Sequence, residues 1–222
     1  NKLRGADISV VADLKTVMKK IEPMIEKNQR EHWITHVHEI KMRNKPGKNK
    51  QDNVFHPDIF LRELSVLADH DCIVTTDVGQ HQMWVAQYYP FCAPRTFLTS
   101  GGLGTMGFGF PAAIGAAVAN PEKQVICVTG DGSFFMNMQE LATLAELNLN
   151  VKIVLFNNQS LGLVRQQQEL FYKGNFYASC FEAQTNFSGL AEIFGIPSVN
   201  LGKTDDPVNS LEKALETPGP YL

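Results

Sequence analysis

The sequence predicts an α/β fold in which a parallel sheet is flanked by helices on both faces. From residue 57 onward, segments rich in β-branched residues alternate with segments of helical periodicity, as in consecutive strand and helix units. Two strand segments, 124–129 and 151–157, carry continuous apolar runs, which is typical of strands covered on both faces. Ligands bind such sheets at the carboxyl ends of the strands. We therefore expect the functional residues in the loops after Thr75, Thr129 and Phe156.

The individual elements follow from apolar spacing and from turn residues. Strands are expected over residues 71–75, near Thr96, and over 124–129, 151–157 and 198–201. Helices are expected over residues 57–68, 80–88, 110–118, 135–146, 162–172, 186–194 and 207–216. Residues 218–222 follow the last helix with turn residues, and we expect a final strand that is cut short.

The chain is expected to divide at the polar segment 44–56, which contains the stretch NKPGKNKQDN and reads as a linker. Residues 1–43 are expected to be the remnant of a central domain and a connector helix, because apolar positions recur at helical spacing from Leu14 to Ile25 and a polar helix follows over 30–42. The first residues hold neither an initiating Met nor a leader, so we expect an excised piece. Residues 57–222 are the main domain.

The composition argues against several function classes. With 20 basic and 23 acidic residues and a net charge of −3, the chain lacks the basic surplus that nucleic acids select, and we expect no nucleic-acid partner. The apolar runs are much shorter than the roughly 20 residues that cross a bilayer, so no membrane span is expected. The four cysteines show no CxxC spacing, which favours a reducing cytoplasm without a disulfide or zinc framework.

The strongest candidate site lies after the strand that ends at Thr129. Gly130 and Gly132 let the backbone approach an anion, and Ser133 can cap a helix that starts about two residues later. Asp131 beside an anion requires a cation between them, and Mg²⁺ suits carboxylate and diphosphate oxygens. The tripeptide alone is more often a plain turn. However, the next strand ends about two dozen residues later at Asn157-Asn158, and its tip should lie beside the first.

GDG, some two dozen residues, and then NN is the motif of thiamine diphosphate enzymes, which this chain resembles. The resemblance implies that Asp131, Asn158 and the main-chain carbonyl of Ser160 hold Mg²⁺. It also implies that the cofactor contacts further residues of these loops: Gly130, Gly132, Ser133, Gly162 and Leu163.

Two further stretches resemble the family. The loop from Ser100 to Gly109 is rich in glycine; by the resemblance its Met106 wedges between the two rings of the cofactor, and the Gly104 carbonyl accepts a hydrogen bond from the aminopyrimidine. The stretch DVGQHQMW resembles acetohydroxyacid synthases, in which the residues matching Gly79, Gln80 and His81 reach the diphosphate. Taken alone, Met106 could be core filler and His81 a solvent-facing helix cap.

The resemblance to acetohydroxyacid (acetolactate) synthase catalytic subunits extends from about Leu61 to Tyr221, and it is best in TSGGLGTMGFGFPAAIGAA and NNQSLGLVRQQQELFY. It implies that pyruvate is decarboxylated and joined to a second 2-keto acid, which begins branched-chain amino acid synthesis. Val164 is apolar where simple 2-keto acid decarboxylases carry an acid. Gln167 replaces the Trp of most such synthases and resembles the bacterial type I isozyme, so the choice between pyruvate and 2-ketobutyrate as acceptor stays open.

The resemblance also implies partners for the chain. In the family the activating Glu lies on a separate pyrimidine-binding domain and acts across a homodimer interface, and no acid here matches it. FAD, where present, mainly contacts the central domain, and a small regulatory subunit can join the assembly. We therefore expect the chain to hold the diphosphate half of the site and to be inactive alone, with an exposed apolar patch around Met106 and Phe108.

Several alternatives stay open. The chain could belong to another thiamine diphosphate enzyme, such as a pyruvate oxidase or a 2-keto acid decarboxylase, or be a non-catalytic diphosphate-binding module. The histidines near residue 36 are expected on a solvated helix rather than in a metal cluster. The aromatic residues between Phe171 and Phe181 are expected to pack, with a mobile lid as the alternative.

Overall fold

In this computed structural model, residues 5–43 and 55–222 are described, and the chain divides into two compact units, Asn1–Asn49 and Lys50–Leu222. The predicted linker 44–56 falls almost entirely on residues outside the described part, and the assignment of residues 1–43 to a central domain stays a prediction.

Between residues 5 and 43 the first unit contains the helices α1 (Leu14–Ile21) and α2 (Glu31–Arg43). The Asp13 carboxylate accepts the Thr16 amide at 2.9 Å and caps α1. The expected helix stops earlier than Ile25, because Pro23 cannot continue it and a 3₁₀ turn (Glu22–Met24) follows. None of residues 5–43 is buried. Of the predicted apolar positions of α1, Leu14, Met18 and Ile21 are exposed and Val17 is half-buried.

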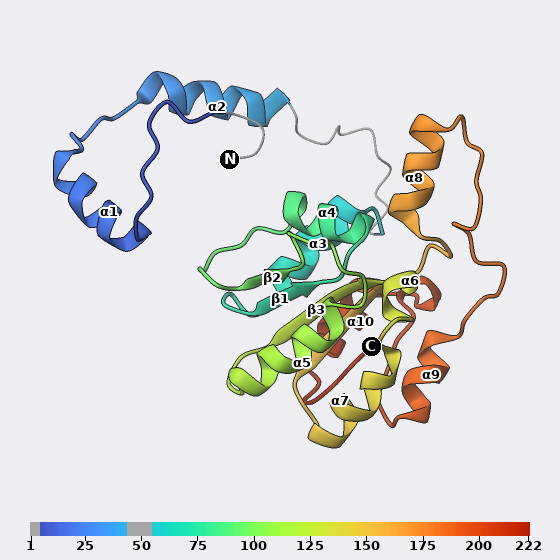
Figure 1. The fold of residues 1–222 in the computed structure, drawn as a ribbon. Helices are drawn as coiled ribbons and strands as arrows, with labels where there is room; N and C mark the ends of the chain where they lie inside the picture. Colours follow the sequence, from blue (N-terminus) through green and yellow to red (C-terminus); the bar gives the residue numbers. More distant parts are fainter. Residues whose placement is uncertain (1–4, 44–54) are drawn as a thin grey trace. The chain divides into compact units, whose positions relative to one another are not determined.

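The second unit contains a four-stranded parallel sheet in the order β2-β1-β3-β4 (Figure 1). The strands are β1 (Ile73–Thr76), β2 (Phe97–Thr99), β3 (Val125–Gly130) and β4 (Val151–Phe156). Ile73 pairs with Val125, and Val125 pairs with Val151. In this register the carboxyl ends of β1, β3 and β4 reach the same edge of the sheet, as the sequence predicts.

Helices cover both faces of the sheet (Figure 1). On one face Val125 and Cys127 of β3 pack in a core with residues of α5 (Gly109–Ala119), α6 (Asp131–Phe134), α7 (Leu141–Leu147) and α9 (Phe187–Ile193). On the other face Ile126 and Val128 pack with α3 (Pro57–Leu67), α4 (Gln80–Tyr88) and α10 (Pro207–Glu216). Because side chains alternate along a strand, one apolar strand serves both cores.

Two expected elements differ from the structure. The helix predicted over 135–146 is not continuous: a 3₁₀ turn (Met138–Glu140) occupies its first half and α7 begins only at Leu141, since Asn137 leaves the helical region with φ −140°. The strand predicted over 198–201 is absent from the described residues. Val199 makes a single backbone contact there, donating to the Leu222 carbonyl at 2.9 Å, and a 3₁₀ turn (Leu201–Lys203) begins two residues later.

The last residues lie along β4. Tyr221 forms an isolated parallel bridge with Lys152, and its amide donates to the Val151 carbonyl at 3.1 Å. In the described part of the chain, no helix combines the length and the apolar character needed to cross a membrane.

Candidate functional site

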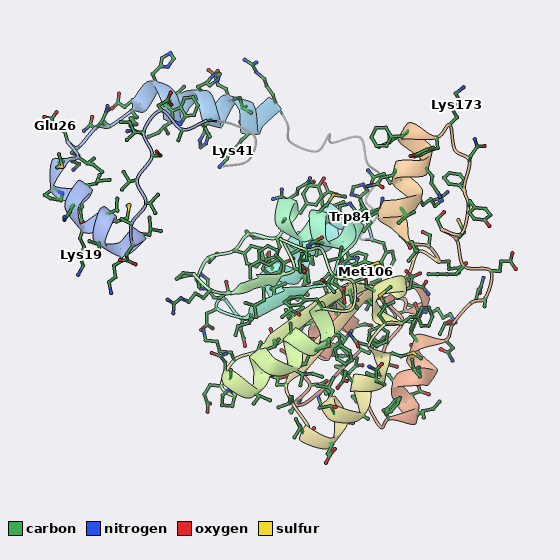
Figure 2. All side chains as sticks on the ribbon, viewed as in Figure 1. Lys19, Glu26, Lys41, Trp84, Met106 and Lys173 are labelled. Atoms are coloured by element: carbon green, nitrogen blue, oxygen red, sulfur yellow. The ribbon has the colours of Figure 1, made fainter. Side chains whose placement is uncertain are left out.

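The loops that follow β1, β3 and β4 enclose a pocket at the carboxyl edge of the sheet. Figure 2 shows Trp84 of α4 and Met106 of the glycine-rich loop in this region, and both line the pocket. Its volume of about 90 Å³ is small beside the roughly 300–1,000 Å³ of typical ligand pockets. The pocket suits a diphosphate-sized group. The predicted site residues among its lining are Gly79, Gln80, His81, Met106, Gly130, Asp131, Gly132, Ser133, Asn158, Ser160, Gly162, Leu163 and Val164.

Asp131 is one of the residues that line this pocket. It begins α6 directly after β3, is 2% exposed, and accepts the Gly132 amide on Oδ1 at 2.8 Å. Oδ2 is buried and has no hydrogen-bond partner among the described residues. Burial raises the pKa of Asp131, while the amides of Gly132, Gln159 and Ser160 act to lower it. The Gln159 and Ser160 amides themselves donate to Asn157 Oδ1 at 3.3 Å and Asn158 Oδ1 at 3.1 Å, so one Asp131 carboxylate oxygen is left for a ligand outside the chain.

The Asn158 side chain lies on the same pocket wall. Its Oδ1 accepts the Ser160 amide at 3.1 Å and the Ser160 hydroxyl at 3.0 Å, and its Nδ2 lies 3.5 Å from Gln80 Oε1. Gln80 in turn donates to Gln166 at 3.1 Å and so joins α4 to α8 (Gly162–Phe171). A metal ligand at Asn158 Oδ1 would have to replace one of the two hydrogen bonds from Ser160.

His81 supplies a second unpartnered polar atom. The ring is 5% exposed, and its Nε2 is buried without a hydrogen-bond partner in residues 5–43 and 55–222. Burial lowers the pKa of His81 to about 4, with a hydrogen bond to the Asp77 main chain opposing the shift. At neutral pH the ring is therefore uncharged. The sequence alternative of a solvent-facing cap is wrong, because the side chain points inward.

The electrostatics of the pocket favour an anion only in the company of a cation. Helices α4, α6 and α8 begin at the pocket lining, and their N-cap residues provide no side-chain cap. The Gly132 amide of α6 donates to Asp131 Oδ1, whereas the first N–H groups of α4 and α8 are available. Among the described residues that line the pocket, however, none is Lys or Arg. A diphosphate beside the Asp131 carboxylate would meet strong repulsion unless a divalent ion lay between them.

Glycines allow the three loops to approach each other. A Cβ on Gly132 would lie 2.6 Å from Leu161 Cδ2, and one on Gly130 would lie 2.9 Å from His81 Nδ1. At Gly162 a Cβ would overlap Gln80 Oε1. A side chain at these positions would require the Leu161, His81 or Gln80 side chain to move.

The sequence suggested that Ser133 caps a later helix, but the structure shows otherwise. Ser133 lies within α6, whose N-cap is Gly130. Its hydroxyl donates to the Val78 carbonyl at 2.8 Å. Ser133 therefore joins the loop after β3 to the loop after β1.

The remaining predicted residues lie at or beyond the pocket mouth. Val164 lines the pocket and is 40% exposed, whereas Gly104 and Gln167 are exposed and do not line it. Gly104 has φ +68°, a conformation that favours glycine. Phe108 is 39% exposed and Met106 is half-buried, so the apolar patch around these two residues stays a prediction.

The aromatic stretch packs only in part. Phe171, Tyr172 and Tyr177 are exposed, whereas Phe181 lies edge-on to Phe135 with ring centroids 6.0 Å apart. Arg165 lies over the Phe176 ring, 4.8 Å from its centroid. The expectation that the whole stretch packs is therefore wrong for its exposed members.

Sequence reasoning assigned no role to Asp77 or Asn137, although both contact the glycine-rich loop that carries Met106. Asp77 follows β1 as Asp131 follows β3, and that repeated position was a usable signal. Trp84 was also missed as a lining residue.

Comparison with known proteins agrees with this geometry. Residues 77–222 match the family described as thiamine pyrophosphate enzyme, C-terminal TPP binding domain. The whole chain is 44% identical over 222 residues to the acetolactate synthase isozyme 1 large subunit of Escherichia coli (strain K12) and covers 39% of that protein. It is 40% identical over 222 residues to the isozyme 2 large subunit of the same organism, covering 40% of it.

A third relative is the acetolactate synthase large subunit of Lactococcus lactis, which is 43% identical over 201 residues, or 90% of this chain and 35% of the relative. The chain thus spans about two fifths of the length of the curated relatives it matches. The family match begins at Asp77, immediately after β1, and includes all three pocket loops. The chain therefore belongs to the thiamine pyrophosphate enzymes, as a C-terminal TPP-binding domain.

Proposed function

We propose that this domain binds the diphosphate of thiamine diphosphate through Mg²⁺ and forms that half of the active site of an acetolactate synthase. The observation that carries the proposal is the buried Oδ2 of Asp131, which has no partner in the described part of the chain. Asp131 lines a pocket whose described lining includes no Lys or Arg. A lone buried carboxylate oxygen is costly unless a ligand satisfies it. A hard divalent cation satisfies the carboxylate and a diphosphate together.

The residues present fit such a group. Asp131, Asn158 and the Ser160 carbonyl would hold Mg²⁺, and Asn158 would exchange a hydrogen bond from Ser160 for the metal. The amides at the starts of α4, α6 and α8 would donate to diphosphate oxygens. His81 is neutral, and its Nε2 lacks a partner among the described residues, so it would add a hydrogen bond without a charge.

Bound thiamine diphosphate supplies an electron sink for the decarboxylation of 2-keto acids. Met106, by its place in the pocket lining, would support the part of the cofactor beyond the diphosphate. Val164 at the mouth offers an apolar wall that neither gives nor takes a proton. Such a wall favours the joining of two carbon fragments over simple protonation.

The similarity to acetolactate synthase large subunits supports a proposal for the substrates, the pathway and the assembly. We infer that pyruvate and a second 2-keto acid are the substrates, that the product enters branched-chain amino acid synthesis in the cytoplasm, and that FAD binds elsewhere in the parent enzyme. The site would be completed by the pyrimidine domain of a second copy in a homodimer, and a small regulatory subunit would join the assembly. Accordingly, the 222-residue chain should bind the cofactor without turning over pyruvate.

The experiment is a calorimetric titration of the chain with thiamine diphosphate, with and without Mg²⁺. We expect binding only with the metal, and loss of binding in Asp131→Ala. The matched control is Asp71→Ala, which removes an exposed carboxylate before β1 that pairs with Lys123 at 2.8 Å. Metal-independent binding, or preferred binding of ATP or NAD, would favour a non-catalytic module. Acetolactate formed by the pure chain would contradict the half-site assignment.

A further inference from the structure

The loop that carries Met106 is held by side chains outside the pocket lining. Met106 lines the pocket, and the turn at Gly107 follows it directly. Gly107 has φ +84°, and a Cβ there would lie 2.7 Å from Asn137 Nδ2. The loop therefore takes a turn that only glycine accommodates easily, pressed against a neighbouring segment.

Asp77 holds one side of this turn. Its carboxylate is fully buried, and Oδ1 accepts the amide of Gly107 at 2.7 Å as well as the amide of Val78 at 2.9 Å. Oδ2 accepts the amide of Gly109 at 3.2 Å. Hydrogen bonds from amides to a carboxylate are stronger than those between neutral groups. Asp77 thus fixes the backbone on both sides of Phe108 to the end of β1.

Asn137 holds the other side of the same turn. Its Nδ2 donates to the Gly107 carbonyl at 2.5 Å. Asn137 lies in the bend between α6 and α7, and Gln139 donates to its Oδ1 at 3.1 Å. The N–H of Gly107 is therefore bound by a side chain that follows β1, and its C=O by a side chain that follows β3.

We propose that Asp77 and Asn137 are positioning residues that hold Met106 in the pocket by clamping the two polar groups of Gly107. Neither side chain lines the pocket, so both act through Met106. This inference rests on the proposed function, because the ligand that Met106 would meet is the ring-bearing part of thiamine diphosphate. The diphosphate part would be bound at the starts of α4, α6 and α8 and not by the loop that carries Met106. Asp77 also accepts the Val78 amide just before α4, so Asn137→Ala separates the two parts of the ligand more cleanly than Asp77→Asn.

The test compares thiamine diphosphate with inorganic pyrophosphate, each with Mg²⁺, by calorimetry on the 222-residue chain. In Asp77→Asn an amide N–H₂ would face backbone donors, and in Asn137→Ala the donor to Gly107 is absent. We expect each variant to bind thiamine diphosphate at least about tenfold more weakly, with less than about a twofold change for pyrophosphate. Asp71→Asn and Asn120→Ala are the matched controls, since Asn120 donates to the Ala116 carbonyl at 3.0 Å at the far end of α5.

A second measurement needs no ligand. In a chain labelled with ¹³C-methyl methionine, the Met106 signal is identified by its absence in Met106→Leu. We expect it to shift or broaden in Asp77→Asn and in Asn137→Ala. Of the 7 methionines, Met136 and Met138 flank Asn137 and should also respond to Asn137→Ala, whereas the remaining signals should stay largely in place. Equal weakening of both ligands, or a Met106 signal unchanged in both variants, would overturn the positioning role. A wild-type chain that binds neither ligand would refute the proposed function, and the Met106 signal would still decide the positioning role.

Discussion

Acidification should destabilise the sheet-containing unit through His81. Burial lowers the pKa of His81 to about 4 from its ordinary value of 6.5. Since the folded state resists protonation, the unfolded state binds more protons between these values, and stability falls as the pH falls through this window. Between pH 7 and pH 5 the loss from this histidine is about 2 kcal/mol, and it approaches about 3 kcal/mol below pH 4.

The assay is urea denaturation of wild type and His81→Asn at pH 7 and pH 5. The chain has 2 Trp, so the comparison is made in a Trp33→Phe background. This leaves Trp84 on α4 as the fluorescent reporter in both proteins. His81→Asn should be less stable at pH 7, yet it should lose about 2 kcal/mol less on acidification than wild type. Burial raises the pKa of both Asp77 and Asp131. Because both proteins contain these carboxyl groups, their contribution to the pH dependence cancels when the two proteins are compared.

The control is His70→Asn, which changes an exposed histidine before β1 and should keep the wild-type pH dependence. If wild type and His81→Asn lose the same free energy of unfolding between pH 7 and pH 5, the histidine is not held neutral by burial. The assignment of a neutral His81 in the pocket would then be wrong.

Two further predictions concern packing and a buried lysine. Gly109→Ala should destabilise the chain by about 3 kcal/mol or more, because its Cβ would overlap the Asp77 backbone nitrogen. In the same helix a Cβ at Gly115 has open space, so Gly115→Ala should stabilise the chain by about 0.5–1 kcal/mol. Thermal denaturation would show the opposite signs of the two changes in stability. Burial lowers the pKa of Lys152 to about 8 from 10.5, so raising the pH from 7 to 9 should stabilise wild type by about 1 kcal/mol relative to Lys152→Met in urea denaturation. Equal stability changes in Gly109→Ala and Gly115→Ala would contradict the close packing at Gly109. An equal effect of pH on wild type and Lys152→Met would contradict the burial of the lysine.

The parts of the fold that the sequence predicted depend on local patterns. Strands β3 and β4 have continuous apolar runs because both faces are covered, and the positions at which these runs end predict that Asp131 and Asn158 lie at one edge. The pairing order β2-β1-β3-β4 does not follow from such patterns, because strand neighbours are chosen by contacts between segments far apart in the chain.

The sequence predictions that were wrong also fail because of contacts between segments far apart in the chain. Apolar periodicity alone favoured one helix over 135–146, but Asn137 leaves the helix and donates to Gly107, which is 30 residues away. Ser133 looked like a cap because it precedes an apolar run, yet its hydroxyl donates to Val78 across the pocket. Asp77 was overlooked because its partners Gly107 and Gly109 lie in another loop. Tertiary hydrogen bonds override local preference at these positions.

The proposed Mg²⁺ site at Asp131 is tested most directly by a crystal structure of the chain with thiamine diphosphate and Mg²⁺. Repeating the structure with Mn²⁺ lets anomalous scattering locate the ion. We predict a metal about 2.1 Å from Asp131 Oδ2, with Asn158 Oδ1 turned from Ser160 to the metal and diphosphate oxygens completing its shell. A diphosphate bound in the pocket with Asp131 Oδ2 still unpartnered, or a metal bound away from Asp131, would contradict the account.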